Sequence, residues 1–237
     1  MSRSIIHISP ELEKRGIGVH LLGGILKDFN NNPGKYNFKD NVIHEVKEYI
    51  TQNFSLKTLK DQEIVSAYRS FYWDHLGIDP TKERPAGEAL TRRILHKKGL
   101  YKINYFVDGY NWASAYSRIP ISAYDLDHVE KPLLLRFADK NESFKGITGK
   151  NHQMDGNELV LCDAKGKILT QFPFRDASHS KITKKTQNIL IVVLGIQNIP
   201  EKNVKEAFEK ILENLRSCET KEKPEITVGT HFAVKNY

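Results

Sequence analysis

The run ILIVVLGI, residues 189–196, is the longest uninterrupted apolar stretch of the chain. It is much shorter than the roughly 18–20 apolar residues that a membrane-spanning helix needs. A short run rich in Ile and Val is typical of a strand that is buried on both faces of a sheet. We therefore expect residues 188–194 to form a central strand, and we expect no membrane segment.

The sequence on either side of this run predicts further strands and one helix. Upstream, residues 133–138 favour a strand, and residues 158–162 and 167–172 favour a hairpin around the turn sequence DAKGK. Downstream, residues 201–216 place their apolar side chains on one face of a helix. The alternating residues 226–234 are typical of a closing strand.

The first hundred residues predict two strands followed by helices. The strands are expected at residues 4–8 and 17–26, and residues 40–54 carry apolar side chains near one face of a helix. A second helix is expected to begin with Thr58 as its N-cap and to end at Gly77. Early helices, central strands and a late helix together predict an α+β fold.

Length and composition favour one folded domain, and we expect residues 1–237 to form it. Lys and Arg exceed Asp and Glu by seven, since 36 − 29 = 7, and the sequence pI is about 9.2. A basic surface attracts polyanions such as nucleic acids, although the same charge also keeps a surface solubilised. Two distant cysteines and the lack of an apolar leader favour the reducing cytoplasm.

Common catalytic motifs are missing from the sequence: it has no GxSxG, P-loop, HExxH or GxGxxG. The segment DLDH, residues 125–128, could supply metal ligands, but the same residues favour turns and no second ligand pair accompanies them. Cys162 lies on an apolar strand with no activating base near it in sequence. We therefore expect no metal, no cofactor and no thiol nucleophile.

Two polar clusters interrupt the apolar pattern before residue 130. In RPAGEALTRR, residues 84–93, the ionic side chains can pair with one another one helical turn apart, or they can contact a ligand. In INYFVDGYNWASAYSRIPISAYDLD, residues 103–127, Asn111 and Ser122 stand where a core would place apolar groups. Buried polar groups must find partners, which here are either backbone turns or a bound ligand.

A third polar cluster is PFRDASHSKITKKT, residues 173–186. It combines the guanidinium of Arg175 and the carboxylate of Asp176 with hydroxyl groups and three lysines. The first two residues can form a turn ion pair. The lysines can be either a solvated face or a track for phosphate groups.

These clusters, in this order, resemble the editing domain of the phenylalanyl-tRNA synthetase beta subunit, and specifically its free-standing relatives. Residues 68–95 are similar to the helical entry of the family, and residues 103–127 resemble its pattern V-D-x-x-N followed by P-x-H-A-F-D. Residues 158–195 are similar to its aspartate, small-residue loop and terminal T-x-N-hydrophobic strand. The resemblance covers about residues 65–195.

The resemblance implies a three-layer β/β/α fold with mixed and antiparallel sheets, and an activity that hydrolyses an amino acid misattached to tRNA. A free-standing form would act in trans on aminoacyl-tRNA released by a synthetase, with which it would make transient contact. Such an enzyme acts as a second sieve after the synthetic site. It needs a positioned water at the ester and donors for the developing oxyanion.

Matching the family motifs residue by residue gives the candidate site. Asn111, Asp125, Asp163 and Thr186 match family residues, whereas Ser122 stands where bacterial synthetases carry His. The residues expected to act in catalysis are Asn111, Ser122 and Asp176. Those expected to contact the substrate are Glu88, Tyr124, Asp125, Asp163, Arg175, Ser178 and Thr186. Those expected to contact nucleic acid are Arg84, Arg92, Arg93, Lys181, Lys184 and Lys185.

Two departures from the family pattern keep other functions open, Ser122 in place of His and the residue at position 192. Val192 stands where the synthetases have a Glu that recognises a tyrosyl hydroxyl, so the edited amino acid differs or the activity is lost. The alternatives to a hydrolase are therefore a non-catalytic tRNA- or RNA-binding module of the same fold and a protein that binds a small amino-acid-like ligand.

Overall fold

The computed structural model describes residues 5–38, 40–220, 226 and 228–236. Its helices are α1 Pro10–Lys14, α2 Asp40–Asn53, α3 Glu63–Leu76, α4 Ala86–Leu95, α5 Tyr105–Ser117 and α6 Glu201–Ser217. Its strands are β1 Ile6–Ile8, β2 Val19–Leu26, β3 Tyr36–Phe38, β4 Ile121–Asp125, β5 Leu133–Phe137, β6 Ser143–Lys145, β7 Asn151–Gln153, β8 Leu159–Cys162, β9 Ile168–Gln171, β10 Arg175–Asp176, β11 Ile189–Ile196, β12 Cys218–Thr220 and β13 Val228–Lys235.

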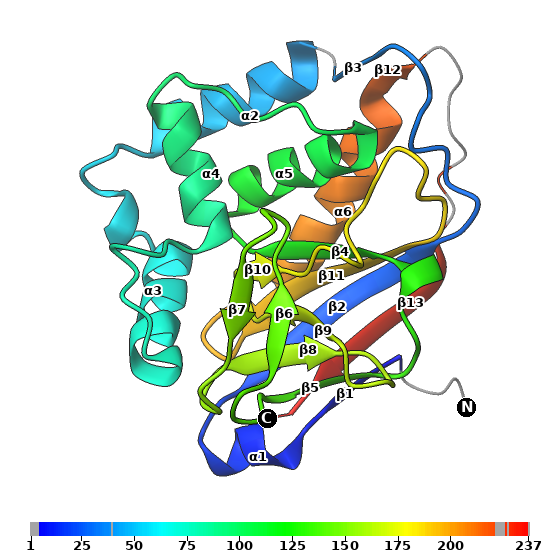
Figure 1. Ribbon diagram of the computed structural model, residues 1–237. Coiled ribbons are helices and arrows are strands. Elements are labelled where there is room, and N and C mark those ends of the chain that lie inside the picture. The colour runs from blue at the N-terminus through cyan, green and yellow to red at the C-terminus, as the bar shows by residue number, and fades with distance from the viewer. Residues whose placement is uncertain (1–4, 39, 221–225, 227, 237) are drawn as a thin grey trace.

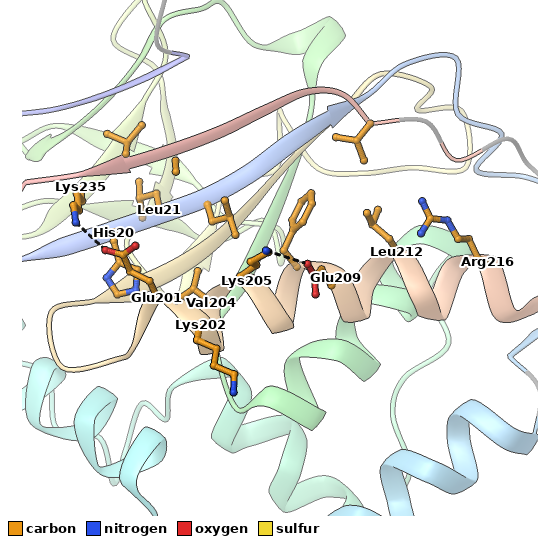
Figure 2. A pocket seen from close by; sticks show the side chains of 15 residues that line it. His20, Leu21, Glu201, Lys202, Val204, Lys205, Glu209, Leu212, Arg216 and Lys235 are labelled. Carbon is orange, nitrogen blue, oxygen red and sulfur yellow. Dashed lines mark hydrogen bonds and ion pairs between the residues drawn. The ribbon is translucent and has the colours of Figure 1, made fainter.

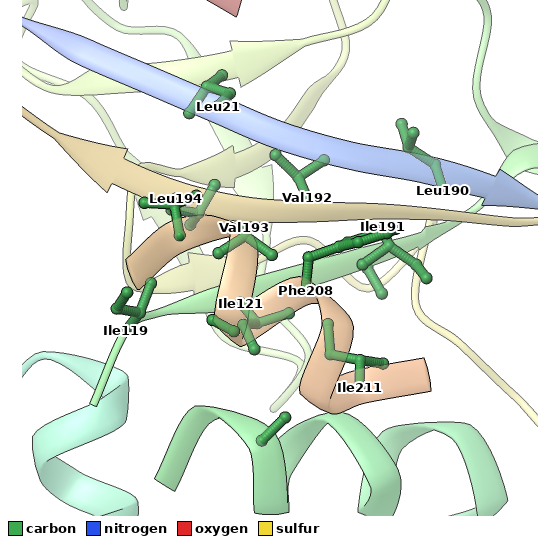
Figure 3. Packing of buried hydrophobic residues seen from close by; sticks show 14 of the residues in the cluster. Leu21, Ile119, Ile121, Leu190, Ile191, Val192, Val193, Leu194, Phe208 and Ile211 are labelled. Carbon is green, nitrogen blue, oxygen red and sulfur yellow. The ribbon is translucent and has the colours of Figure 1, made fainter. Parts of the chain in front are cut away.

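The apolar run 189–196 is β11, which pairs on both sides within an antiparallel sheet of order β13-β2-β11-β4. All of its residues are buried. Ile191 and Val193 point toward Phe208 of α6, whereas Leu190 and Val192 lie on the opposite face of the strand (Figure 3). The prediction of a central strand is therefore confirmed.

A second sheet has the order β1-β5-β8-β9-β10. Its pairs are antiparallel except for β1 with β5, which run parallel. The predicted hairpin around DAKGK is the β8–β9 pair. Strand β10 is the short edge of this sheet, and it carries Arg175 and Asp176.

Helices form the third layer of the molecule. Helix α6 packs on β2 and β11, and α5 lies against α6 and contacts β4, so both cover one face of the β2–β11 sheet (Figure 1). Helices α2 and α4 pack in turn on α5. The result is an α+β fold with a mixed sheet, an antiparallel sheet and a helical layer, as the resemblance implied. One hydrophobic cluster extends from Ile5 to Cys218.

Helix α5 occupies a segment that the sequence patterns left unassigned. Asn104 caps it by accepting a hydrogen bond from the Val107 amide at 3.0 Å, and Arg118 ends it with a left-handed backbone at φ 61°. Most of the helix is buried, so it shows no single apolar stripe. Its end leads directly into β4 and thereby fixes where Ser122 and Tyr124 lie.

The prediction that Thr58 caps the second helix is wrong. Thr58 precedes a 3-10 turn, Leu59–Asp61, and makes no side-chain capping bond there. Helix α3 begins instead at Glu63, after Gln62. Its predicted end at Gly77 is confirmed, because Gly77 adopts a left-handed conformation. In the part of the chain that the structure describes, no helix is long and apolar enough to cross a bilayer.

Candidate functional site

A cavity of about 390 Å³ lies beside β4, between α5 and the segment that follows β10. Its walls are largely apolar, with Ile103, Val107, Ile147 and Ile182 among them. Polar groups converge on it from three places. They are Tyr110 and the N-cap residue Asn104 from α5, Tyr124 from β4, and Asp176 with Ser180, Lys181, Thr183 and Lys184 from the C-terminal side. Its size and its combination of an apolar wall with convergent polar groups are typical of a small-molecule site.

Strand β4 places Ser122 and Tyr124 on the same face, because side chains two residues apart in a strand point the same way. Across from them stands Asp176 of β10. The Ser122 hydroxyl donates to Asp176 Oδ1 at 3.3 Å. The fold therefore brings together Ser122 and Asp176, which are 54 positions apart in the sequence and were both predicted to act in catalysis.

The carboxyl group of Asp176 is enclosed by protein atoms, and this changes its acidity. Burial raises the pKa of Asp176 to about 6, and hydrogen bonds from the hydroxyls of Thr170 and Ser122 lower it only in part. A carboxylate with a pKa close to the working pH can both accept and return a proton. Such perturbed groups are common at functional sites.

Two hydroxyl groups at the cavity lack hydrogen-bond partners within the described residues. They are Tyr124 Oη and Ser180 Oγ, both buried. Burial, and after it the charge of Asp176, raise the pKa of Tyr124 well above its usual value. Because unsatisfied buried hydroxyls are costly, these two are candidates to bind a ligand.

Other predicted residues lie near the cavity, and their hydrogen bonds hold the segments that form its walls. Thr186 Oγ1 donates to Asp125 Oδ2 at 2.5 Å, and the Asp125 amide donates to the Ser180 carbonyl at 2.9 Å. These bonds hold the loop that carries Lys181 and Lys184 against the end of β4. Ser178 is half-buried, and its amide donates to the Lys145 carbonyl at 2.8 Å.

Asn111 does not line the cavity. It is half-buried on α5, directly after Tyr110, which does line it. Successive residues of a helix point about 100° apart, so Tyr110 and Asn111 cannot both face the same wall. The structure therefore brings Tyr110, rather than Asn111, to the carboxylate of Asp176, whose charge raises the pKa of Tyr110 after burial does.

Asp163 and Glu88 do not line this cavity, and their hydrogen-bond partners lie elsewhere in the fold. Asp163 Oδ1 accepts from the amides of Lys165 and Lys167, both at 2.9 Å, and so builds the β8–β9 turn. Glu88 is fully buried and accepts from Arg69 Nη1 and from Arg92 Nε at 2.7 Å. Both carboxylates are thus occupied by the fold itself.

The predicted nucleic-acid contacts divide into two groups. Arg92 is held by Glu88, and Arg93 donates to the Gly99 carbonyl at 2.9 Å and lies over the Tyr101 ring. The four that are exposed are Arg84, Lys181, Lys184 and Lys185. Three of these four stand on one loop at the cavity rim.

Sequence reasoning missed Tyr110 and Thr170. Thr170 is a buried polar residue in an apolar strand, and Tyr110 is one of several aromatic residues in an all-buried helix. A buried Thr can bond to nearby backbone, as Thr170 of β9 does to the Arg175 carbonyl of β10 at 3.0 Å, so its type alone carries little signal.

A larger cavity of about 690 Å³ lies between α6 and strands β2 and β13 (Figure 2). Four of its charged side chains form two ion pairs: Lys235 Nζ lies 2.8 Å from Glu201 Oε1, and Lys205 Nζ lies 3.8 Å from Glu209 Oε1. None of the residues predicted from the sequence lines it. The smaller cavity at Asp176 is therefore the better candidate site.

The described residues contain no group of three or more His, Cys, Asp or Glu side chains placed to hold a metal ion. In the segment DLDH, Asp125 accepts from Thr186 and Asp127 Oδ1 accepts from Asn188 Nδ2 at 2.9 Å. Burial raises the pKa of the Cys162 thiol, whose Sγ lies 3.3 Å from the Leu134 carbonyl oxygen.

Comparisons with known proteins give one family and several relatives. The B3/4 domain family matches residues 67–217. The beta subunit of phenylalanine–tRNA ligase from Mycoplasma genitalium is 26% identical over 121 residues, which are 51% of this chain and 14% of that protein. The corresponding subunit from Bifidobacterium longum is 30% identical over 105 residues, 42% of this chain and 12% of that protein.

A solved N-terminal fragment of the phenylalanyl-tRNA synthetase beta subunit from Pyrococcus horikoshii is 14% identical with a TM-score of 0.44; it covers 91% of this chain, and the match spans 49% of the fragment. The chain spans no more than 14% of the length of the two bacterial relatives.

Proposed function

Since the chain belongs to the B3/4 domain family and is a homologue of that domain of the phenylalanyl-tRNA synthetase beta subunit, we propose that it removes misattached amino acids from tRNA in trans. The observation that carries the proposal is the carboxylate of Asp176. It has a pKa of about 6, accepts from Ser122 and stands in the wall of a 390 Å³ cavity.

In the proposed reaction Asp176 acts as a general base. It takes a proton from a water molecule while the water oxygen attacks the carbonyl carbon of the aminoacyl ester. The tetrahedral intermediate then breaks the bond to the ribose oxygen, which receives the proton from Asp176. A base with a pKa near 6 is largely ionised at neutral pH and still basic enough for this transfer.

The hydroxyls around Asp176 have separate roles in this proposal. Ser122 donates to Oδ1 and keeps the carboxylate oriented. Tyr124 has an unused hydroxyl proton that is available to the developing oxyanion. Removing one such donor commonly costs about 10²–10³ in rate. The apolar wall, which includes Ile103, Val107 and Ile182, contacts the amino-acid side chain.

The partner proposed here is aminoacyl-tRNA in the cytoplasm, with transient contact to the synthetase that releases it. The exposed lysines at 181, 184 and 185 support a contact with tRNA phosphates next to the cavity. Because such contacts release counterions, tRNA affinity is expected to fall steeply with salt.

The test uses a panel of mischarged tRNAs and follows release of the amino acid. Wild-type protein is expected to deacylate at least one of them, and Asp176→Asn is expected to lose activity by at least 10²-fold. The matched control is Asp74→Asn, which changes an exposed carboxylate on α3. If tRNA binds but no member of the panel is deacylated, the protein is a non-catalytic tRNA-binding module instead.

Two other outcomes would change the proposal in different ways. Binding of a free amino acid that added tRNA does not influence would indicate a small-ligand protein. Activity that survives in Asp176→Asn would show that the hydrolase exists but that its base lies elsewhere.

A further inference from the structure

A second hollow, of about 380 Å³, lies on the other side of Asp176. It shares Ile147 and Asp176 with the first cavity, so these two residues form the partition between the hollows. Its remaining walls come from the β6–β7 hairpin and from Phe174 and Arg175. We call it the hairpin chamber.

The hairpin is fixed relative to Asp176 by backbone hydrogen bonds. The Ile147 amide donates to the Asp176 carbonyl at 3.1 Å, and Gly146 forms an isolated antiparallel bridge with Ala177. A small separate core also anchors it, with Phe144 of β6 packed among residues of β8 and β9. The members of this core are Ala138, Phe144, Met154, Val160, Ile168 and Ala177. The chamber is therefore built into the fold.

The chemistry of the hairpin chamber differs from that of the first cavity. Thr148, Lys150, His152 and Arg175 line it, whereas the first cavity has an aliphatic wall that includes Ile103, Val107 and Ile182 and carries its lysines, Lys181 and Lys184, on one loop. Burial lowers the pKa of His152, and the charges of Arg175 and Lys150 lower it further, while Glu83 raises it. The ring thus senses a net positive potential, which favours an anion in this hollow.

Aromatic groups accompany these cations. The His152 ring stacks on Phe144 with centroids 5.2 Å apart, and the guanidinium of Arg175 lies 4.7 Å from the centre of the Phe174 ring. Arg175 Nη2 also lies 2.5 Å from Glu83 Oε1, an ion pair that is partly exposed and so exchangeable. Proteins that bind single-stranded nucleic acids likewise combine cations for the backbone with aromatic side chains.

We infer that the hairpin chamber binds the phosphate and sugar of the 3′-terminal nucleotide, while the first cavity binds the amino-acid side chain. The inference rests on the proposed function and makes it more specific. An aminoacyl ester links the carboxyl group of an amino acid to the ribose of an anionic nucleotide, so the amino-acid side chain lies on one side of the ester and the phosphate on the other. The first cavity suits the side chain and the hairpin chamber suits the phosphate. Because the two hollows meet at Asp176, the ester between these two parts would lie at the proposed base.

The first test measures binding alone and needs no catalysis. Adenosine 5′-monophosphate, adenosine and inorganic phosphate are titrated into the full chain. The nucleotide is expected to bind at least 10-fold more tightly than either of the other two probes. Lys150→Ala and His152→Gln are each expected to weaken its binding by about 5-fold or more, with adenosine binding unchanged. Lys140→Ala, an exposed lysine outside the chamber, is the matched control.

The second test uses two ester substrates. Lys150→Ala is expected to raise KM for mischarged tRNA by about 5-fold or more and to leave hydrolysis of the ethyl ester of the same amino acid unchanged. An equal loss on both substrates would overturn the inference, because the ethyl ester carries no nucleotide. Equal binding of the nucleotide in Lys150→Ala, His152→Gln and wild type would also overturn it. If no ester is hydrolysed, the proposed function fails, and the binding test still decides the inference by itself.

Discussion

Asp176 is expected to lower the stability of the fold that it serves. Its pKa is about 6 in the folded protein against a usual value of 3.8, so the folded state binds the proton more tightly than the unfolded chain. The stabilising effect of this proton is complete below pH 3.8 and is lost as pH rises through about 6. At about 1.36 kcal/mol per pKa unit the loss amounts to about 3 kcal/mol.

The first prediction follows from the loss of stability that ionisation of Asp176 causes. Asp176→Asn should raise the free energy of unfolding at pH 7.5 by about 2–3 kcal/mol, because the neutral amide replaces a buried charge. At pH 3.5, where the native carboxyl group is protonated, the variant and the wild type should differ little. Denaturant unfolding at both pH values measures the difference. A variant that is less stable at pH 7.5 would contradict the argument.

The second prediction concerns the pH dependence of hydrolysis. A general base works in its ionised form, so kcat/KM should rise from pH 5 to pH 7 with a midpoint near 6, the pKa of Asp176. Rates measured on one mischarged tRNA, corrected for uncatalysed ester hydrolysis at each pH, test this. Residual activity of Asp176→Asn should lack that midpoint. A profile that is flat between pH 5 and 7 would exclude Asp176 as the base.

At the level of single residues, the sequence predicted part of the candidate site. Ser122 and Asp176 could be predicted because the order of motifs places them, although 54 residues separate them. Tyr110 could not be distinguished from Asn111 before the phase of helix α5 was known. A one-residue difference in a helix changes the direction of a side chain by about 100°.

At the level of elements, the buried carboxylate of Glu88 on α4 connects this helix to α3 through an ion pair. Arg69 and Arg92, from these two helices, both donate to it. Arg69 also donates to the Pro80 carbonyl at 3.2 Å, so the connecting loop depends on the same network. Removing one member of a buried ionic group leaves uncompensated charge in the interior.

The third prediction is that Glu88→Gln destabilises the protein by about 3 kcal/mol, because two partly buried guanidinium groups lose their counter-ion. The matched control is Glu209→Gln, which breaks an exposed pair with Lys205 at 3.8 Å and should cost no more than about 0.5 kcal/mol. Both free energies come from denaturant unfolding. Equal effects would mean that Glu88 is not a structural joint and would strengthen its predicted role at the substrate.

The fourth prediction concerns the crossing of α4 and α5. A Cβ atom at Gly87 would lie 2.2 Å from the backbone carbonyl oxygen of Arg118. Gly→Ala in an exposed helix usually stabilises by about 1 kcal/mol, but here the helices must separate, at a cost of roughly 1–3 kcal/mol or more. Gly87→Ala should therefore lower the melting temperature, whereas Ser70→Ala, at an exposed position of α3, should not.

The predicted elements were those with a clear period. Strands β8, β9 and β11 and helices α2 and α6 follow from alternation, apolar runs or a single apolar stripe. Helix α5 does not, because it is buried between α4, α6 and β4 and carries apolar or small residues on most sides. The β6–β7 hairpin is three residues on each strand, too short for a periodic pattern.

At the scale of the whole molecule, both ends of the described chain are tied into the core. Strand β1 pairs with β5, and β13 pairs with β2. Asn236 Oδ1 accepts from the Val19 amide at 2.8 Å, and its Nδ2 donates to the Ile17 carbonyl at 3.0 Å. Segments far apart in sequence therefore share sheets, and we expect residues 1–237 to unfold as one domain.

The fifth prediction is a single cooperative unfolding transition. Trp112 is 7% exposed on α5 in the helical layer, and Trp73 is 62% exposed on α3. In a Trp73→Phe variant, fluorescence excited selectively at tryptophan reports the surroundings of Trp112, while far-ultraviolet circular dichroism reports helices and sheets together. Because α5 packs on α6 and α6 packs on β2 and β11, the helical layer cannot melt without exposing the face of the central sheet. The two denaturant midpoints should therefore coincide, and a Trp112 transition at lower denaturant would mean that the helical layer and the sheets are separate folding units.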